Sequence, residues 1–550
     1  MSARGAGRHA LPTQGTGTLA GAGVLWRSML RTSRWGIAIW ALALVGLLYY
    51  MALAVNEVLG AQGLQARAAI IGLPAGAMLS GPGYGLDNYT LEVMVANELL
   101  GLYAVMVGIM SLRLAVRHTR TDEEAGRTEL LRALPVGRLA PVTAALATCL
   151  LANVVVSGLM LAALLLLGFP LPGSVGFCLG LMLVGLVFAA IGALCAQLSS
   201  SARTAASLAG AVLALAYLLR AVGDASEPGG NVLSWLTPVG WIQQQRLFVE
   251  QRWWPLLLVV AMLIAVGLAS FLLQQRREVG AGLLPQRAGR DRARALGRRV
   301  IGVGARLDRG RLFGWTVSIL VAAVLTGSLA GPVADAFRDL PQLQAVLGLR
   351  GGQAALQEIV VAAMATFLVF FAMVVAIFAV QGAHRLRRDE SLGRVELLLA
   401  TAVSRWWVMG SQLLLNVAGC AWLLVIAGFG LGVGAQPGMG EAVLGTFIAA
   451  ALWNLPVVAC WLALSMLALG LGRGAVLVWI GLVACIVVGM YGPLLNLPQS
   501  VLDAEPFTSV NALEIVHEQA SMLVPAGYAL AAAILAALAL ILYSRRDLGR

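Results

Sequence analysis

Lysine is absent from this sequence of 550 residues, and charge of either sign is scarce. All 38 basic residues are arginine, and 12% of residues are charged, about half the share found in soluble globular proteins. A P-loop needs a lysine that reaches the β- and γ-phosphates of a nucleotide, so the chain has no ATP-hydrolysing site of that kind. So little polar surface indicates that lipid is the main solvent of this protein.

Cysteine and histidine are scarce as well. The six cysteines lie in apolar runs without paired spacing and the four histidines are scattered, which favours packing roles over disulfides or metal sites. No constellation for acid–base or nucleophilic chemistry stands out. We therefore expect no metal, no cofactor and no enzymatic activity in this chain. The net charge of +12 comes from arginines between apolar runs, which indicates membrane topology and no nucleic-acid partner.

Long apolar runs are what the sequence has in abundance. A run of about 20 residues crosses the hydrocarbon core as a helix. The sequence predicts an all-α polytopic membrane protein with twelve transmembrane helices, at 35–55, 93–116, 141–168, 174–197, 204–222 and 255–273 in the first half, and at 313–333, 357–381, 407–433, 441–470, 474–495 and 522–543 in the second.

Arginines gather in alternate loops between these spans. The stretch 274–312 alone contains eleven of them. Because arginine-rich loops stay inside, we expect both termini to be cytoplasmic, in the plasma membrane of a bacterium. The predicted organisation is a first half at 1–273, a basic cytoplasmic linker at 274–312 and a second half at 313–550.

The two halves look like a duplication. Each half has six predicted spans, which is an even number, so each half would begin and end on the same side of the membrane. The halves would then be parallel repeats related by an axis along the membrane normal. Each half opens on a basic stretch that leads to tryptophan, "RTSRWGIAIW" at 31–40 and "DRGRLFGW" at 308–315. The ends of the halves match as well, in "QQRREVG" at 274–280 and "YSRRDLG" at 543–549.

One charged segment is kept in both halves. "TDEEAGRTELLRALPVGR" follows the second predicted span at 121–138, and "RDESLGRVELLLATAVSR" follows the eighth at 388–405. Over 120–138 and 387–405, eleven of nineteen positions are identical without a gap. A topology signal needs arginine in any order and not this sequence twice. We therefore favour a docking element for a cytoplasmic partner over a solvated loop, and two copies suit a symmetric, dimeric partner.

As a helix, this segment would place acidic residues in its first turn, at the positive end of the helix dipole. Glu123 and Arg127 would form an i,i+4 ion pair, as would Glu390 and Arg394. A glycine kept in both copies weakens a helix, which indicates a bend or a close backbone approach.

Six spans with a charged short helix after the second, present twice, resemble the membrane subunit of ABC-2 type exporters. The fused twelve-span form is similar to actinobacterial permeases for polyketide-antibiotic (tetronasin-type) and multidrug export. The resemblance implies that the charged segments are coupling helices seated on an ATPase subunit, through Asp122, Glu123, Gly126, Arg127 and Glu129 and through Asp389, Glu390, Gly393, Arg394 and Glu396. It also implies an amphipathic interfacial helix near the N-terminus, for which "VLWRSMLRTSRW" at 24–35 is the candidate.

The substrate pathway is marked more weakly. Polar groups at membrane depth are functional candidates, and aromatic side chains could form stacking walls for a hydrophobic substrate. On this basis the candidates are Asn97, Glu98, Tyr103, Phe367, Phe370 and Phe371. Glu98 facing a cavity would favour a cationic drug, whereas Glu98 paired with a nearby arginine would be structural.

These features favour the permease subunit of an ATP-driven exporter of hydrophobic drugs or antibiotics. The resemblance implies two copies of a separate ATPase subunit, which would bind ATP and magnesium. One alternative is an ion-coupled secondary transporter with six-plus-six repeats, which would need several titratable groups in mid-membrane. Another is a membrane protein for the export or assembly of lipid or polymer.

Overall fold

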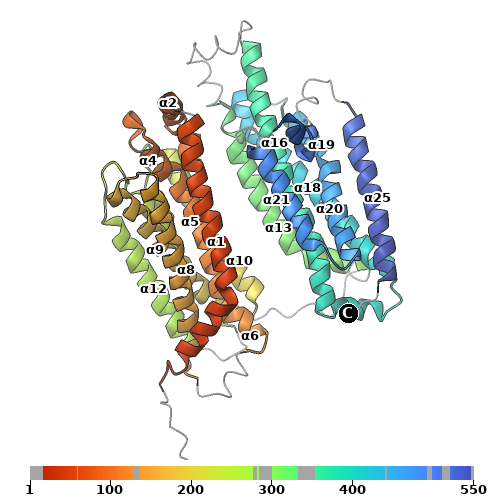
Figure 1. The fold of residues 1–550 in the computed structure, drawn as a ribbon, viewed down its shortest axis with the longest axis horizontal. Coiled ribbons are helices and arrows are strands. Elements are labelled where there is room, and N and C mark those ends of the chain that lie inside the picture. Colours follow the sequence, from red (N-terminus) through yellow and green to blue (C-terminus); the bar gives the residue numbers. More distant parts are fainter. Residues whose placement is uncertain are drawn as a thin grey trace, which may run out of the picture. The chain divides into compact units, whose positions relative to one another are not determined.

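The computed structural model describes residues 17–58, 60–72, 74–127, 136–276, 282–283, 300–331, 353–439, 443–491, 498–510 and 521–546. In these ranges the chain forms helices, turns and loops. It divides into two compact units, Met1–Ala288 and Gly289–Arg550, which are described one at a time (Figure 1). The predicted linker cannot be compared in full, because 277–281 and 284–299 lie outside the described residues.

Unit 1 is built on long apolar helices. The second of them contains two π-helical turns, which divide it into five consecutive segments. The long helices are α1 (Ala22–Val58), the run α4 (Leu91–Met94), η2 (Val95–Leu99), α5 (Leu100–Val116), η3 (Arg117–Thr121) and α6 (Asp122–Glu124), then α8 (Ala140–Leu166), α9 (Leu171–Leu198), α10 (Ala202–Ser226) and α12 (Pro255–Arg276). Short helices join them, namely α2 (Gly60–Ile71), α3 (Pro74–Ser80), η1 (Leu86–Asn88), η4 (Ser234–Leu236) and α11 (Pro238–Gln243).

Unit 2 follows the same order of elements. Its long helices are α13 (Val300–Gly327), α16 (Gln353–Ser391), α18 (Arg405–Met439), the broken pair α19 (Val443–Trp453) and α20 (Leu455–Gly470), α21 (Ala475–Tyr491) and α25 (Leu523–Arg545). A short helix, α17 (Arg394–Leu399), follows α16, and α22 (Gln499–Asp503) and α23 (Pro506–Ser509) precede α25.

Eleven helices in the described ranges are long and apolar enough to cross a membrane. They correspond to eleven of the twelve predicted spans, and the chain is an all-α polytopic membrane protein. The remaining prediction, 474–495, coincides with α21, whose apolar part Ala475–Met490 is shorter than about 20 residues, the length that spans the hydrocarbon core. Residues 492–497 lie outside the described part of the chain, so the twelfth span remains a prediction.

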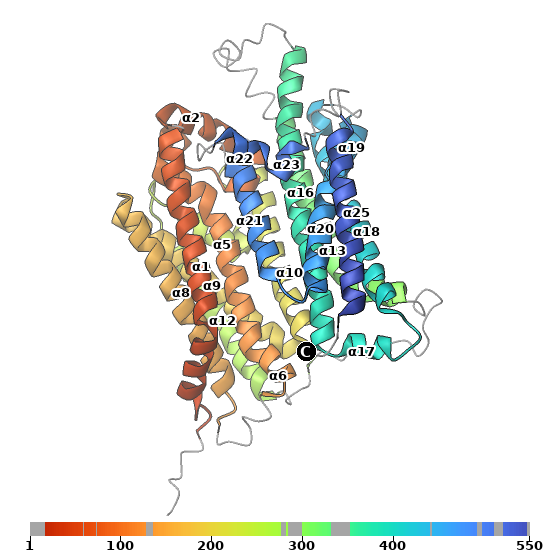
Figure 2. The ribbon, with the colours of Figure 1, turned by 45° about the vertical axis from the view of Figure 1, so that its right-hand side comes forward.

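Helix packing repeats from one unit to the other. In unit 1, α1 packs on α8, α5 on α9, and α9 on α12. In unit 2, α13 packs on α18, α16 on α20, and α20 on α25, which are the helices at the same places in the order (Figures 1 and 2). Each unit therefore has its own core, with its second and fourth long helices at the centre and its first and last at the edge.

The first helix of each unit begins earlier than the predicted span. The candidate interfacial helix at 24–35 is not a separate element, because α1 runs without a break from Ala22 to Val58. No proline interrupts this segment, and Leu25 and Met29 pack against Ala140 and Ala144 of α8, so the helix continues. In unit 2, α13 likewise begins at Val300, within the stretch predicted as linker.

Candidate functional site

The second long helix of unit 1 ends at a glycine in the left-handed conformation. Gly126 has a φ of 72°, which costs glycine little and strains any other residue. The amides of Ala125 and Gly126 donate to the carbonyl oxygens of Thr121 and Glu123, at 3.1 and 3.0 Å, and close the helix. We call residues 121–127 the first glycine turn.

The corresponding helix of unit 2 ends in the same way. Gly393 has a φ of 68°, and the amides of Leu392 and Gly393 donate to the carbonyl oxygens of Arg388 and Glu390, at 3.1 and 2.9 Å. Each of these residues lies 267 positions after its counterpart in the first glycine turn. We call residues 388–394 the second glycine turn. The duplication seen in the sequence is therefore a duplication of backbone geometry.

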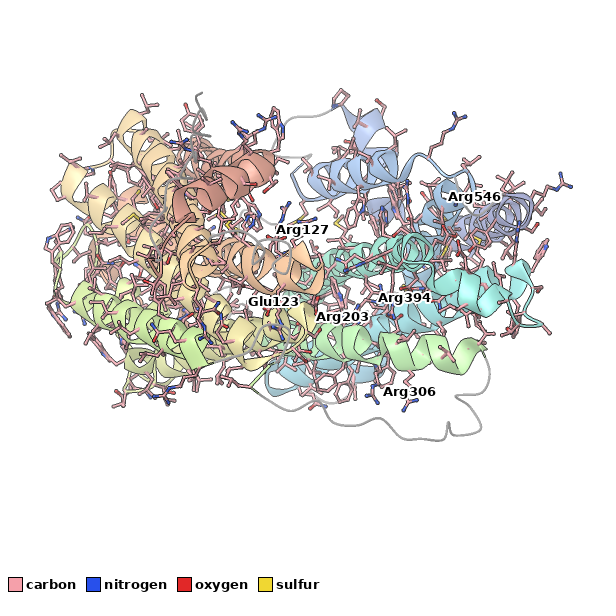
Figure 3. All side chains as sticks on the ribbon, turned by 90° about the horizontal axis from the view of Figure 1, so that it is seen from below. Glu123, Arg127, Arg203, Arg306, Arg394 and Arg546 are labelled. Atoms are coloured by element: carbon pink, nitrogen blue, oxygen red, sulfur yellow. The ribbon has the colours of Figure 1, made fainter. Side chains whose placement is uncertain are left out.

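An arginine folds back across each turn. Arg127 Nη1 lies 2.8 Å from Asp122 Oδ1, and Arg394 Nη1 lies 2.9 Å from Asp389 Oδ1. The outer parts of both arginines remain in solvent, since their side chains are 70% and 62% exposed. Figure 3 shows Arg127 and Arg394 on their separate units. Each turn thus presents a cation whose position is fixed by a carboxylate.

The predicted i,i+4 pairs of Glu123 with Arg127 and of Glu390 with Arg394 are wrong. The helix ends at the glycine between the two members, so the spacing of a continuous helix does not apply. Instead, Glu123 accepts from Arg120 Nη1 at 2.8 Å, and both side chains are almost buried. Glu390 lies 3.5 Å from Arg546, near the end of α25.

The expected placement of the acidic residues in a first helical turn is also wrong. Asp122 and Glu123 lie in the last turn before Gly126, and Asp389 and Glu390 lie in the last turn of α16. Carboxylates are unfavourable at this negative end of the helix dipole. Their arginine partners offset that cost, so each turn is an ion-pair cluster that closes a helix.

A short helix follows the second turn. Gly393 precedes α17, in which Val395 is buried against unit 2 while Glu396 and Leu397 are exposed. A coupling helix after the second span was predicted for both halves. Its copy in the first half falls on 128–135, including Glu129, and lies outside the described residues.

A polar link connects the first glycine turn to α1. Ser33 Oγ lies 2.6 Å from His118 Nε2, and His118 Nδ1 lies 3.6 Å from Asp122 Oδ2. Ser33 and His118 are buried. We call Ser33, His118 and Asp122 the first polar link.

Unit 2 contains a link at the same place. Asp308 of α13 binds Arg385, whose Nε lies 3.8 Å from Asp389 Oδ2. Arg385 and Asp389 lie 267 positions after His118 and Asp122. We call Asp308, Arg385 and Asp389 the second polar link.

Sequence reasoning did not identify either link. The sequence feature that could have indicated them is the basic stretch before the tryptophan in each half. Ser33 lies seven residues before Trp40, and Asp308 lies seven residues before Trp315. This common spacing gives the two residues equivalent positions on α1 and α13, although serine and aspartate differ in charge and chemistry.

Comparison with known proteins places the chain in a family. The family described as "Multidrug efflux system permease Rv1217c, C-terminal domain" matches residues 298–544. The multidrug efflux system permease protein Rv1217c of Mycobacterium tuberculosis is 35% identical over 517 residues, which cover 92% of each chain. The chain belongs to the ABC-2 type exporter permeases.

Two of the substrate-pathway candidates have structural partners in this permease. Asn97 is buried in the π-helical turn η2 and donates to the carbonyl oxygen of Tyr84 at 2.9 Å. Glu98 accepts from Arg67 Nε at 3.0 Å and from the Tyr89 hydroxyl at 3.2 Å. The local arginine pair considered for Glu98 is therefore the arrangement observed.

The aromatic candidates of the permease divide into buried and exposed residues. Tyr103 is buried against Phe177, and its hydroxyl donates to the carbonyl oxygen of Leu44 at 3.1 Å. Phe371 is buried in the core of unit 2. Phe367 and Phe370 are exposed on α16.

Proposed function

We propose that this chain is the membrane subunit of an ATP-driven exporter that moves hydrophobic drugs or antibiotics out across the bacterial plasma membrane. A separate ATPase dimer docks on the two glycine turns, which then face the cytoplasm together with both termini. ATP and magnesium bind to that dimer, because the permease has no lysine for a P-loop. The family membership and the name of the mycobacterial relative support this proposal.

The main observation behind this proposal is that the glycine turn occurs twice. The same backbone conformation, hydrogen bonds and arginine–aspartate pair occur twice, 267 residues apart. A solvated loop needs no such repetition. A dimer of identical ATPase subunits has two equivalent surfaces, and two equivalent docking elements match them.

The exposed face of α17 has the composition of a docking surface. Leu397 is 74% exposed beside the charged Arg394 and Glu396, and Leu392 before the helix is also exposed. Buried Val395 attaches the opposite face to unit 2. An apolar centre with a polar rim is the usual arrangement of a protein interface.

The position of the glycine turns explains how the ATPase could be coupled to transport. Each glycine turn closes the second long helix of its unit, which packs in the centre of that unit. Movement of the ATPase subunits on ATP binding would displace the turns, and through them these central helices, so that access to the substrate changes sides. Exposed Phe367 and Phe370 on α16 are our candidates for contact with the cargo.

Co-purification of the ATPase subunit tests the docking surface. In Leu397→Ser we expect the affinity for the ATPase subunit to fall about tenfold, because a central apolar contact of an interface is lost. The matched control is Leu307→Ser, which changes another exposed leucine of unit 2, on α13. Equal ATPase recovery with Leu397→Ser and Leu307→Ser would contradict docking on α17.

A further inference from the structure

The first polar link is a complete chain of contacts from α1 to the glycine turn. His118 uses both ring nitrogens, Nε2 toward Ser33 and Nδ1 toward Asp122. A carboxylate only accepts hydrogen bonds, so the proton between this pair lies on Nδ1, while Nε2 and the serine hydroxyl share one hydrogen bond. Asp122 also holds Arg127 across the turn. The exposed end of the turn is thereby connected to a residue of the first helix.

The second polar link makes the same connection with different chemistry. Arg385 joins Asp308 of α13 to Asp389, which holds Arg394 across the second turn. Asp308 is further fixed by Arg311, whose Nε and Nη2 lie 2.9 Å from its two carboxylate oxygens.

Arg311 extends the second link into the core of unit 2. It donates to Asn416 Oδ1 of α18 at 2.7 Å, and its guanidinium lies 4.0 Å from the centre of the Phe378 ring. With Trp40 and Trp315 aligned, the position of Arg311 is occupied by Gly36 in unit 1. The first link therefore lacks this extension.

Repetition across the units also decides what the links are for. Ser33, His118 and Asp122 have the order of a nucleophile, a base and a carboxylate. However, Ser33 is 1% exposed, which leaves no access for a substrate. The equivalent positions in unit 2 hold aspartate, arginine and aspartate, which include neither a hydroxyl group nor an imidazole base. What both sets share is the connection between two helices.

We propose that each polar link fastens the first helix of its unit to the glycine turn, and that the first link is the weaker, so that the first turn yields before the second. Ser33 and Asp308 are then positioning residues, which act on the turns through His118 and Arg385. This inference rests on the proposed function where it concerns coupling. The link itself is a property of the permease alone.

The ranking follows from charge. The first link begins with a hydrogen bond to the uncharged Ser33 hydroxyl, whereas the second begins with an arginine–carboxylate ion pair. A hydrogen bond between two oppositely charged groups is stronger than one to an uncharged hydroxyl. The charged link resists displacement more, which makes the two docking elements unequal despite their common backbone.

Hydrogen exchange of the purified full-length permease in lipid nanodiscs tests the links without any ATPase subunit. In Ser33→Ala we expect amide exchange in the first glycine turn to become about fivefold faster, with the second turn unchanged. In Asp308→Ala we expect about tenfold faster exchange in the second turn only. Ser33→Thr and Asp308→Glu keep the donor or acceptor and should restore protection.

Replacing residues of the first link by those of the second tests the ranking. The double variant Ser33→Asp with His118→Arg gives the first link the residues of the second, and we expect exchange in the first turn to slow. Exchange in the unaltered second turn should stay the same. If Ser33→Ala and Asp308→Ala left exchange in their own turns unchanged, or if the double variant sped it, the proposal would be overturned.

Coupling is measured separately, in vesicles that contain the permease and the ATPase subunit. For Ser33→Ala we expect unchanged co-purification but about twofold less drug moved per ATP hydrolysed, with recovery in Ser33→Thr. Unchanged coupling in Ser33→Ala, together with altered exchange in the first turn, would refute the positioning role. Failure of ATP to drive drug movement in the wild-type vesicles would instead refute the proposed function, and the exchange results would still decide whether the links fasten the turns.

Discussion

Glycine is the residue on which both turns depend. Gly126 and Gly393 adopt positive φ values, and Gly126 has open space where a Cβ atom would lie. A substitution there acts through backbone strain and not through a clash. We expect Gly126→Ala to destabilise the first turn by about 1–2 kcal/mol and to speed its amide exchange.

Gly158→Ala is the control for that substitution. Gly158 lies inside α8, where a Cβ atom would also meet open space, but its φ is not positive. Alanine there should stabilise the helix by about 0.5–1 kcal/mol. If Gly126→Ala and Gly158→Ala changed thermal stability in the same direction, the conformational role of the turn glycine would be wrong.

The Arg67–Glu98 pair has a stability role at the residue scale. The Glu98 carboxylate raises the pKa of Arg67 by hydrogen bonding, against the opposing effect of burial, so the guanidinium stays charged. Arg67→Met leaves the Glu98 carboxylate, 11% exposed, without its cation. We expect a loss of about 2 kcal/mol in thermal unfolding experiments.

A double-mutant cycle separates pairing from packing. The double variant Arg67→Met with Glu98→Gln removes both charges, and it should be less destabilised than the sum of the two single variants. Strict additivity would show that the two side chains do not interact. A cationic-drug role for Glu98 predicts, in contrast, a change of substrate preference in Glu98→Gln.

At the scale of elements, α17 is attached by one buried side chain. Val395 is 3% exposed, whereas Leu397 on the same helix is 74% exposed. Val395→Ala removes buried methyl groups, and we expect about tenfold faster hydrogen exchange in α17. Leu397→Ala should leave that exchange unchanged. Similar effects of both substitutions would contradict the observed orientation of α17.

Elements were the level at which the sequence was most informative. Apolar runs of membrane-spanning length located eleven long helices, because burial in lipid leaves little choice of backbone structure. Helix ends were harder to locate. No charge or proline marks where α1 should begin, and the early starts of α1 and α13 depend on packing against later helices.

The site was predictable as a segment but not as a set of contacts. Repetition identified the charged segments, and the glycine kept in both copies indicated a bend. Partners were predicted wrongly because the i,i+4 rule assumes a continuous helix, and this helix ends between Glu123 and Arg127. The links to Ser33 and Asp308 join residues far apart in the chain, which spacing along one helix cannot reveal.

For the whole molecule, the central claim is that a separate ATPase drives this permease through the two glycine turns. Vesicles containing the purified chain and its ATPase subunit should move a hydrophobic fluorescent drug when ATP is supplied. Movement should stop with a hydrolysis-deficient ATPase, and native mass spectrometry should show two ATPase subunits per chain. Drug movement by the chain alone, driven by a proton or sodium gradient and indifferent to ATP, would contradict the account.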